Sequence, residues 1–431
     1  MTEEQQKIYQ ALMAYYESHR RREFVPQELV EHMEPVFKEL GFRQAVRPEE
    51  KVNLLVVKDD AAGDFVLFSP FLREVRRIYP KAHISLYASD RNEALAKCCP
   101  YIDNLMVKEL EKEEGSVWEM FPILAKQAVE YFVPYHFDLG FCGRLGLRSA
   151  GILLMYMGGV KRRVAWTHIR EDDQGRLVDL GWNAMISVPV PLHSNMQSDA
   201  DRNLYILEYL LQLPIADRQL ELWTLASDRE AARAALAPLQ SKKHIKRLYT
   251  VMPCTSQRFR EWPVERFIEF LKVIMKREKD VGLVMLGAKE DASKAEMLAK
   301  AFPGRALSLA GKLPFRVSAE VVGMTEKYIG NDTVLMHFAA AKQVPVLVVF
   351  PFPAEIGLHY LSIPIRFQPY HVPAVIVLPA RAAGHRCNLK PGTGCAEQQP
   401  HCILNVTVEK MLEGYKYLDR CMAEGRSMIL K

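Results

Sequence analysis

The sequence contains no long hydrophobic run. Its most apolar stretches, 152–157 and 344–352, are far shorter than the roughly 20 residues that span a bilayer. Residues 1–10 are polar and acidic and lack the apolar segment of a signal peptide. We therefore expect a cytoplasmic protein without membrane-spanning helices.

The sequence also has few cysteines and little net charge. None of its eight cysteines forms a C-x-x-C pair, and this usage is typical of a reducing compartment. The net charge of +5 leaves room for a basic patch but lacks the strong, clustered excess of most nucleic-acid-binding proteins. We therefore expect neither a disulfide framework nor a nucleic-acid partner.

The composition is that of a globular protein, with 49% hydrophobic and 25% charged residues. A chain of 431 residues is too long for one ordinary domain. Residues 1–48 are predicted to form a helical extension, because apolar residues recur at helical spacing from Ile8 to Leu40. The basic run 19–22 within it is more readily a solvated turn than an anion-binding patch.

Strands alternating with helices begin at residue 52. The apolar run 52–57 predicts a buried parallel strand, and an amphipathic helix is expected over 65–79. Further strands are expected at 84–87, 105–107 and 137–141, and a further helix at 146–157. We assign residues 49–220 to one doubly wound α/β domain.

The alternation restarts after residues 218–246, which we interpret as a linker and a helix. Strands are expected at 248–252, 281–286, 326–329 and 346–350, and helices at 264–277 and 291–301. The chain is therefore predicted to form two Rossmann-like domains facing a cleft, the second spanning 221–431. Ligands of such folds bind beyond the carboxyl ends of the strands, so the loops after strands are candidate sites.

The first candidate loop follows the strand 52–57 and ends at Gly63 and Asp64. Its carboxylates are expected to point toward the cleft, where one could act as a general base. From position alone, a cap of the helix that follows is the favoured role of Asp64. The residues themselves leave both roles open.

The second candidate loop opens the C-terminal half with Thr255, Ser256 and Arg260. Hydroxyl groups and a cation between a strand and a helix suit a diphosphate, and we expect Pro263 to be the first residue of that helix. Arginine can bind phosphate oxygens through two parallel hydrogen bonds. An exposed polar loop above a packed Trp262 is the alternative.

The third candidate loop carries Asp332 and Thr333, with His337 on the helix that follows. Asn331 or Asp332 is expected to cap this helix, and Thr333 and the following amides could hold phosphate. His337 would lie about one turn into the helix. A histidine at such a position is more often a packed residue than a catalytic one.

Other patterns are weak or absent. No G-x-G-x-x-G follows either opening strand, which disfavours a nicotinamide dehydrogenase. Asp199 and Asp201 spell a D-x-D motif, but a helix is expected directly after them, so we predict no metal there. The spacing of Cys387, Cys395, His401 and Cys402 matches no zinc pattern, and we expect them to be structural.

Taken together, these segments resemble glycosyltransferase family 9. The resemblance covers roughly residues 52–410 and none of 1–48. The segments that carry it are 63–70 with 72–73 and 79–82, 137–139, 146–150, 161–164, 202–204, 262–267, 286–288, 309–311, 330–333 with His337, 339–341 and 344–346.

This resemblance implies an inverting glycosyltransferase of the GT-B fold that uses a nucleotide-diphosphate sugar and no metal or other cofactor. The donor in that family is typically ADP-heptose, and the acceptor is usually the anionic inner core of lipopolysaccharide. The implied location is the cytoplasm, with peripheral contact at the inner face of the inner membrane left open. We expect a monomer or a weak oligomer.

The resemblance also implies roles for individual residues. Asp64 matches the family's catalytic base. The residues implied in donor and nucleotide binding are Thr255, Ser256, Arg260, Asp332, Thr333, His337 and Gly287. Arg144 and Arg148, on the acceptor side, are candidates for meeting the acid groups of a charged glycolipid.

The sequence departs from the family pattern at three places. Arg260 stands where many members have lysine, Val334 where glycine is usual, and Ala61-Ala62 where a hydroxyl residue is frequent. These departures leave alternatives open: a hexosyltransferase with a UDP or GDP donor, a non-catalytic nucleotide-sugar-binding protein, or another sugar-nucleotide enzyme such as an epimerase.

Overall fold

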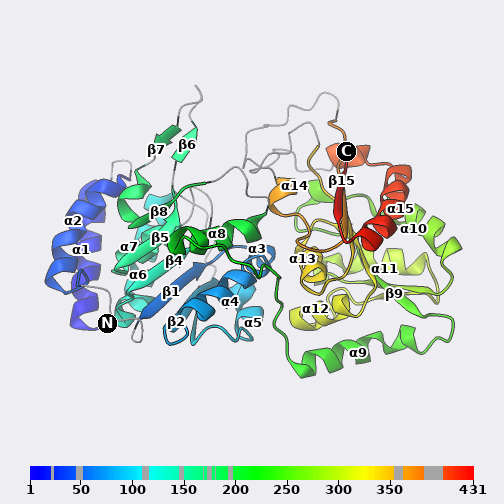
Figure 1. Cartoon of the computed structure of the whole chain (residues 1–431), viewed down its shortest axis with the longest axis horizontal. Helices are drawn as coiled ribbons and strands as arrows, with labels where there is room; N and C mark the ends of the chain where they lie inside the picture. Colours follow the sequence, from blue (N-terminus) through cyan, green and yellow to red (C-terminus); the bar gives the residue numbers. More distant parts are fainter. Residues whose placement is uncertain are drawn as a thin grey trace. The chain divides into compact units, whose positions relative to one another are not determined.

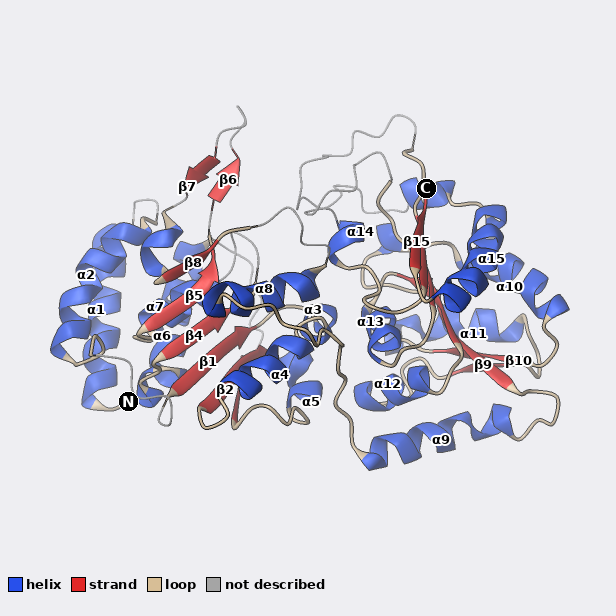
Figure 2. Ribbon diagram, in the orientation of Figure 1, coloured by secondary structure: helices blue, strands red, loops and turns tan. Residues whose placement is uncertain are grey.

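The computed structural model describes most of the chain (Figures 1 and 2). The described residues are 1–20, 24–44, 52–108, 116–144, 150–167, 169–171, 177–179, 181–192, 198–353, 363–382 and 401–431. They form two compact units. Unit 1 comprises Met1–Ala61, Phe71–His193 and Asn203–Ala216, and unit 2 comprises Ala62–Pro70, Ser194–Arg202 and Asp217–Lys431.

Unit 1 is built on a six-stranded parallel sheet in the order β3-β2-β1-β4-β5-β8. Its strands are β1 (Asn53–Lys58), β2 (His83–Ser89), β3 (Asn104–Lys108), β4 (Leu139–Cys142), β5 (Arg162–Trp166) and β8 (Val188–Val190). The order reverses between β1 and β4, which is the Rossmann arrangement with its ligand-binding switch point at these two strands. Strands β6 (Ile169–Glu171) and β7 (Leu177–Asp179) form a separate antiparallel pair.

The helices of unit 1 form the N-terminal extension and accompany the strands of the Rossmann part. They are α1 (Glu3–His19), α2 (Pro26–Glu39), α4 (Ser69–Ile78), α5 (Asp90–Ala96), α6 (Val117–Tyr131) and α7 (Ala150–Met157), with short 3₁₀ turns η2 (Val133–Tyr135) and η3 (Trp182–Met185). Helix α8 (Asp199–Leu211) begins in unit 2 and ends in unit 1. The predicted helical extension is thus confirmed as α1 and α2.

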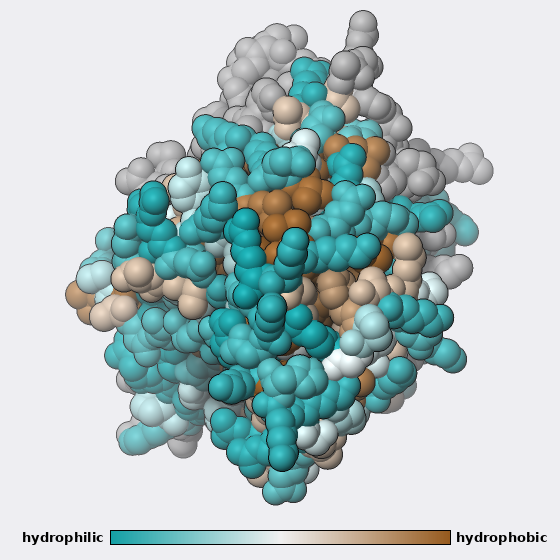
Figure 3. Space-filling model, turned by 90° about the vertical axis from the view of Figure 1, so that its right-hand side faces the viewer, coloured by the Kyte–Doolittle hydropathy of each residue, from teal (hydrophilic) through white to brown (hydrophobic). Residues whose placement is uncertain are grey.

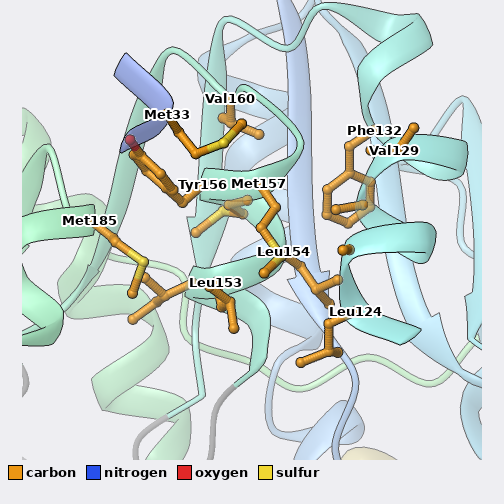
Figure 4. Close-up of a cluster of buried hydrophobic side chains, with 14 of the residues drawn as sticks. Met33, Leu124, Val129, Phe132, Leu153, Leu154, Tyr156, Met157, Val160 and Met185 are labelled. Atoms are coloured by element: carbon orange, nitrogen blue, oxygen red, sulfur yellow. The ribbon is translucent and has the colours of Figure 1, made fainter. Parts of the chain in front are cut away.

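The extension is part of the core of unit 1. Side chains of α1 and α2, among them Ile8, Leu12 and Met33, share one buried cluster with α6 and α7. Figure 4 shows Met33 of α2 among side chains of α6 and α7. Every residue from Gly151 to Met157 is buried, because α7 is covered on its outer side as well as by the sheet. A helix that is apolar all round requires such enclosure.

A polar contact also ties α2 to α7. The Glu34 carboxylate accepts hydrogen bonds from Arg43 (2.8 Å to Nη2) and from the Tyr156 hydroxyl (3.1 Å). Burial alone would raise the pKa of Glu34, but these hydrogen bonds and the Arg43 charge bring it below its usual value. The carboxylate is therefore held in its ionised form.

The single helix predicted over 65–79 is wrong, because the chain forms two helices there. Helix α3 (Ala62–Val66) ends before α4, and Ser69 Oγ donates to the Val66 carbonyl (2.7 Å). Pro70 has no N–H with which to continue the hydrogen bonds of α3. The break separates Asp64 from α4, and α3 belongs to unit 2.

Unit 2 contains a seven-stranded parallel sheet in the order β11-β10-β9-β12-β13-β14-β15. Its strands are β9 (Arg247–Met252), β10 (Val281–Met285), β11 (Ala306–Ser308), β12 (Lys327–Asn331), β13 (Val346–Val349), β14 (Ala374–Val377) and β15 (Ser427–Leu430). The order reverses between β9 and β12, so this unit has its own switch point.

Most helices of unit 2 alternate with these strands along the chain, and α9 precedes the first of them. Besides α3 they are α9 (Ala226–Gln240), α10 (Val264–Arg277), α11 (Ala292–Lys300), α12 (Phe315–Gly323), α13 (Val334–Ala341), α14 (Ile363–Arg366) and α15 (Val408–Glu424), with 3₁₀ turns η4 (Arg258–Arg260), η5 (Lys289–Asp291) and η7 (Cys402–Asn405). The two doubly wound α/β domains are therefore as predicted.

The face seen in Figure 3 is mainly hydrophilic, with an apolar area among polar side chains. Among the described residues, no helix combines the length and apolar character that crossing a bilayer requires.

Candidate functional site

The residues implied in donor binding lie at the switch point of unit 2. Strands β9 and β12 are neighbours in register, with Met252 opposite Gly330. Arg260 follows β9, and Asp332 and Thr333 follow β12. The sheet therefore brings the second and third candidate loops side by side at the edge where ligands of open α/β sheets bind.

Asn331 joins these two loops. Its side-chain oxygen accepts a hydrogen bond from the Trp262 amide (3.0 Å), and its Nδ2 donates to the Pro253 carbonyl (2.8 Å). The side chain is fully buried. Asn331 is therefore a structural bridge between the loops and not the helix cap that the sequence predicted.

The loop after β9 is held by a carboxylate that sequence analysis missed. Glu261 Oε1 accepts a hydrogen bond from the Thr255 amide (3.2 Å), and Oε2 of the same residue pairs with Lys294 of α11. Thr255 Oγ1 also donates to the Gln257 carbonyl (2.6 Å), while Ser256 is exposed. The contacts of Glu261 with Thr255 and Lys294 fix the loop. No sequence motif indicated them, because Lys294 lies on α11, far from the loop in the chain.

Arg260 and Asp332 form an ion pair across the switch point. The Asp332 side chain is 5% exposed and that of Arg260 is 25% exposed. The Arg260 Nε atom has no hydrogen-bond partner. The guanidinium proposed to bind diphosphate is thus held by a carboxylate while part of it still faces solvent.

Helix α13 begins differently from the prediction. Its N-cap is Thr333, and neither Asn331 nor Asp332 caps it, because these two side chains are engaged by the loop after β9 and by Arg260. The Thr333 side chain makes no capping hydrogen bond and lies 3.2 Å from the Tyr328 hydroxyl. Val334 is the first helical residue. The first amides of α13 therefore lack an intrahelical partner, as in helix termini that bind anions.

The start of α10 also differs by one residue. The helix begins at Val264, and Pro263 occupies the N-cap position in an extended conformation. The prediction of Pro263 as the first helical residue is therefore wrong by one position, because its ψ of 138° is not helical.

His337 lies on the fourth position of α13 and is 3% exposed. Burial lowers its pKa to about 4, although the Asp332 and Asp199 carboxylates act in the opposite direction. Its Nδ1 atom has no hydrogen-bond partner. His337 is therefore a neutral imidazole at neutral pH.

Asp64 directly follows Gly63, the residue that packs against this histidine. Helix α3 packs against α13 within unit 2, and a β-carbon on Gly63 would lie 2.8 Å from His337 Cδ2. Asp64 is the third residue of α3 and does not occupy its N-cap position. Of the two roles that the sequence left open, the cap is wrong, and the role of base stays a prediction.

The aspartates of the D-x-D motif are held by arginines. Asp199 accepts two hydrogen bonds from Arg366 (3.0 and 2.8 Å), and Asp201 accepts from Arg218 (3.0 Å) and from the Tyr370 hydroxyl (2.7 Å). In the described ranges, no group of three or more His, Cys, Asp or Glu side chains could hold a metal ion.

The remaining candidates are scattered. Gly287 adopts a φ of 151°, and a β-carbon there would lie 2.7 Å from the Asp291 carboxylate, so glycine is required by local packing. Arg144 lies in unit 1, where its Nη1 atom is 3.6 Å from Oδ1 of Asp59. Arg148, Cys387 and Cys395 fall outside the described residues. His401 Nδ1 lies 3.1 Å from the buried Cys402 Sγ, within unit 2.

Comparison with known proteins identifies the class. Two doubly wound parallel sheets, each with its own switch point, form the GT-B architecture. Residues 183–385 match the family model described as glycosyltransferase family 9 (heptosyltransferase), which confirms the predicted resemblance and supports the prediction of a glycosyltransferase. The matched segment contains Arg260, Asp332 and His337 but not Asp64. No curated protein sequence matches the chain.

Solved structures share the fold. The glycosyltransferase family 9 protein of Veillonella parvula is 16% identical, with 87% of this chain and 99% of that chain covered and a TM-score of 0.64. The E. coli ADP-heptose lps heptosyltransferase II is 15% identical, with 87% and 100% covered and a TM-score of 0.60. The E. coli heptosyltransferase WaaC with ADP is 16% identical, with 85% and 100% covered and a TM-score of 0.55. These likenesses concern the fold.

Proposed function

We propose that this glycosyltransferase is inverting and moves a sugar, heptose from ADP-heptose, to a hydroxyl group of a lipopolysaccharide core or a related cell-surface glycan. The family of the matched segment and the names of the two E. coli enzymes support this donor and this class of acceptor. The observation that carries the proposal is the packing of Gly63 against His337, since it holds the helix of Asp64 against the helix that follows Asp332.

In the proposed reaction, Asp64 takes the proton from the acceptor hydroxyl as its oxygen attacks the anomeric carbon. The bond from that carbon to the diphosphate breaks on the opposite side, and the nucleoside diphosphate leaves with the electron pair. The configuration at the carbon is thereby inverted.

The leaving diphosphate gains negative charge, and the chain's own groups at the switch point of unit 2 would stabilise it. Arg260 supplies a guanidinium, and the first amides of α13 supply partial positive charge at a helix N-terminus. Asp332 must give up its ion pair with Arg260 when the diphosphate arrives and is then available to a sugar hydroxyl. Charge compensation by these groups is why we propose a reaction that needs no metal.

Two measurements test this proposal. Calorimetric titration with ADP, UDP and GDP should show a preference for ADP that weakens in Arg260→Ala, whereas Arg258→Ala, an exposed arginine of the same 3₁₀ turn, should bind normally. A preference for UDP or GDP would instead indicate a hexosyltransferase. Asp64→Asn should keep ADP binding and lose roughly a hundred- to ten-thousand-fold in transfer rate, and a rate within a few-fold of wild type would remove Asp64 from the role of base.

A further inference from the structure

Tyr328 is a buried residue of β12 whose hydroxyl group contacts the third candidate loop. The tyrosine is fully buried, and its Oη atom donates a hydrogen bond to the Asn331 carbonyl (2.8 Å) and lies 3.2 Å from Thr333 Oγ1. Asn331 and Thr333 flank Asp332, the ion-pair partner of Arg260. The phenol therefore contacts the turn between β12 and α13 on both sides of a residue implied in donor binding.

Gly330 makes room for this contact. Residues 328 and 330 of a strand point to the same face of the sheet, so the phenol lies along the strand over position 330. A β-carbon on Gly330 would lie 3.0 Å from the Tyr328 Oη atom and 2.7 Å from the Met252 carbonyl oxygen. The absence of a side chain at position 330 thus lets the hydroxyl group lie at the end of β12.

The directions of the two hydrogen bonds follow from the number of protons. A carbonyl oxygen can only accept, so the bond to Asn331 uses the single proton of the Tyr328 hydroxyl. The Tyr328 oxygen must then accept from Thr333, and this bond uses the single proton of the threonine hydroxyl. Burial raises the pKa of the Tyr328 hydroxyl above its ordinary value, so the phenol keeps its proton at neutral pH. In this arrangement Thr333 Oγ1 offers a ligand lone pairs but no proton.

The lone pairs of Thr333 Oγ1 are available to a ligand. Thr333 is the N-cap of α13, but its side chain accepts no hydrogen bond from the helix amides, as an N-cap threonine usually does. Thr333 and the adjacent Val334 are only half-buried. Within the part of the chain that the structure describes, the Tyr328 hydroxyl is the one hydrogen-bond partner of the Thr333 side chain.

The direction of this bond decides which part of a nucleotide sugar can contact Thr333. Diphosphate oxygens accept hydrogen bonds, and two acceptors repel each other when neither holds a proton. The amides of α13 and the Arg260 guanidinium carry protons and remain the groups for a diphosphate. A sugar hydroxyl can both donate and accept, so it can give its proton to Thr333 Oγ1.

We propose that Tyr328 is a positioning residue, which fixes Thr333 as a hydrogen-bond acceptor for a hydroxyl group of the sugar that is transferred. Thr333 then selects the sugar and does not donate to the diphosphate, which differs from the phosphate contact that the family resemblance implies. The contact exists in the nucleotide sugar and is lost in the nucleoside diphosphate, which favours release of the product. This inference rests on the proposed use of a nucleotide-diphosphate sugar.

Thr333→Val is the first test, because valine keeps the shape of the side chain and removes its hydroxyl group. Calorimetric titration of the full-length variant with pyrophosphate and with ADP should give wild-type affinities, whereas ADP-heptose should bind about three- to tenfold more weakly. A threonine that donates to phosphate would instead weaken all three ligands. Thr407→Val, at the exposed N-cap of α15, is the matched control and should bind each ligand as wild type does.

Tyr328→Phe tests the positioning itself. Without the phenol oxygen, the Thr333 proton is free for a phosphate, so pyrophosphate and ADP should bind about threefold more tightly. The preference for ADP-heptose over ADP should shrink, and adding Thr333→Val should abolish the gain. A tyrosine that only supports the fold would weaken these ligands or leave them unchanged. Tyr249→Phe, at a buried tyrosine of β9 whose hydroxyl donates to Glu278, is the control.

Wild-type affinity for ADP and pyrophosphate in Thr333→Val, together with weaker ADP-heptose, would support the inference. Weaker ADP or pyrophosphate in this variant, or unchanged ADP-heptose, would overturn it, whether or not Tyr328→Phe folds. If the wild type prefers UDP or GDP, the proposed donor is wrong, and the same comparison with that nucleotide and its glucose conjugate decides the inference separately. A wild type that binds neither pyrophosphate nor any of these nucleotides would overturn both.

Discussion

Gly63 and His337 approach each other so closely that only glycine fits at position 63. A β-carbon there would lie 2.8 Å from Cδ2 and 3.2 Å from Nε2 of the buried imidazole. Carbon atoms that are not bonded gain most from contact at about 3.5–4.0 Å, so an added methyl group would force the two helices apart. Gly63 is therefore set by a tertiary contact, and its neighbour Asp64 depends on that contact for its position.

Gly63→Ala should reduce transfer by roughly tenfold to a hundredfold, because a displacement of about 1 Å near a reacting group has such effects. ADP binding should be kept. The double variant Gly63→Ala/His337→Ala removes the clashing ring and should recover part of the lost rate, as measured by a double-mutant cycle. If Gly63→Ala alone transfers sugar at the wild-type rate, this contact does not position Asp64.

Glu261→Gln should strengthen ADP binding by about three- to tenfold at low salt, since it removes a negative charge from the loop that carries Thr255 while keeping the hydrogen bond. Titration at two salt concentrations measures this, and the gain should shrink as salt rises. Glu265→Gln, an exposed glutamate in the first turn of α10, is the matched control. Weaker binding in Glu261→Gln would mean that the carboxylate only supports the loop.

His337 should make the protein less stable in mild acid. Its folded pKa of about 4 is below the unfolded value of 6.5, so the unfolded state binds the extra proton between these values and stability falls as pH falls. The contribution is at most about 1.4 kcal/mol per pH unit in that window. Urea unfolding at pH 7 and 5 should show a smaller loss for His337→Gln than for wild type, whereas His244→Gln, at an exposed position, should lose as much as wild type.

Glu34→Gln should destabilise unit 1 by about 1 kcal/mol at pH 7, because it removes the charge partner of Arg43 in a partly buried site. The pKa of Glu34 is lowered in the folded protein, so its contribution is full above its unfolded pKa and is lost as pH falls through the folded value. The difference from wild type should therefore disappear in acid, as followed by urea unfolding. Glu39→Gln, at an exposed residue of the same helix, should change stability by less than about 0.5 kcal/mol; an equal loss there would contradict a special role for Glu34.

The strands that the sequence predicted best are those with continuous apolar runs, such as 52–57 and 281–286, since burial on both faces leaves a clear pattern. Strands β5, β8, β11, β14 and β15 were missed, because short apolar runs are compatible with either strand or helix. Helices α6, α12 and α15 were missed as well. Their apolar spacing competes with loop signals such as Pro122 inside α6.

The candidate loops could be placed from sequence because each follows a predicted strand. The hydrogen-bond and ion-pair partners of the loop residues could not be predicted. Glu261, Lys294 and Asn331 act through contacts between elements that are distant in the chain, and spacing carries no information about such contacts. The expected caps of α13 failed for the same reason, since the side chains at 331 and 332 are taken by residues of another loop.

The chain enters unit 2 three times, first with α3, then with the start of α8, and finally with everything after residue 216. A fragment beginning at the linker before α9 would therefore omit the helix that carries Asp64 and the aspartates that hold Arg366 and Tyr370. No single cut divides this protein into two self-sufficient halves. Exchange of donor specificity by swapping C-terminal halves between relatives would have to carry these two short insertions along.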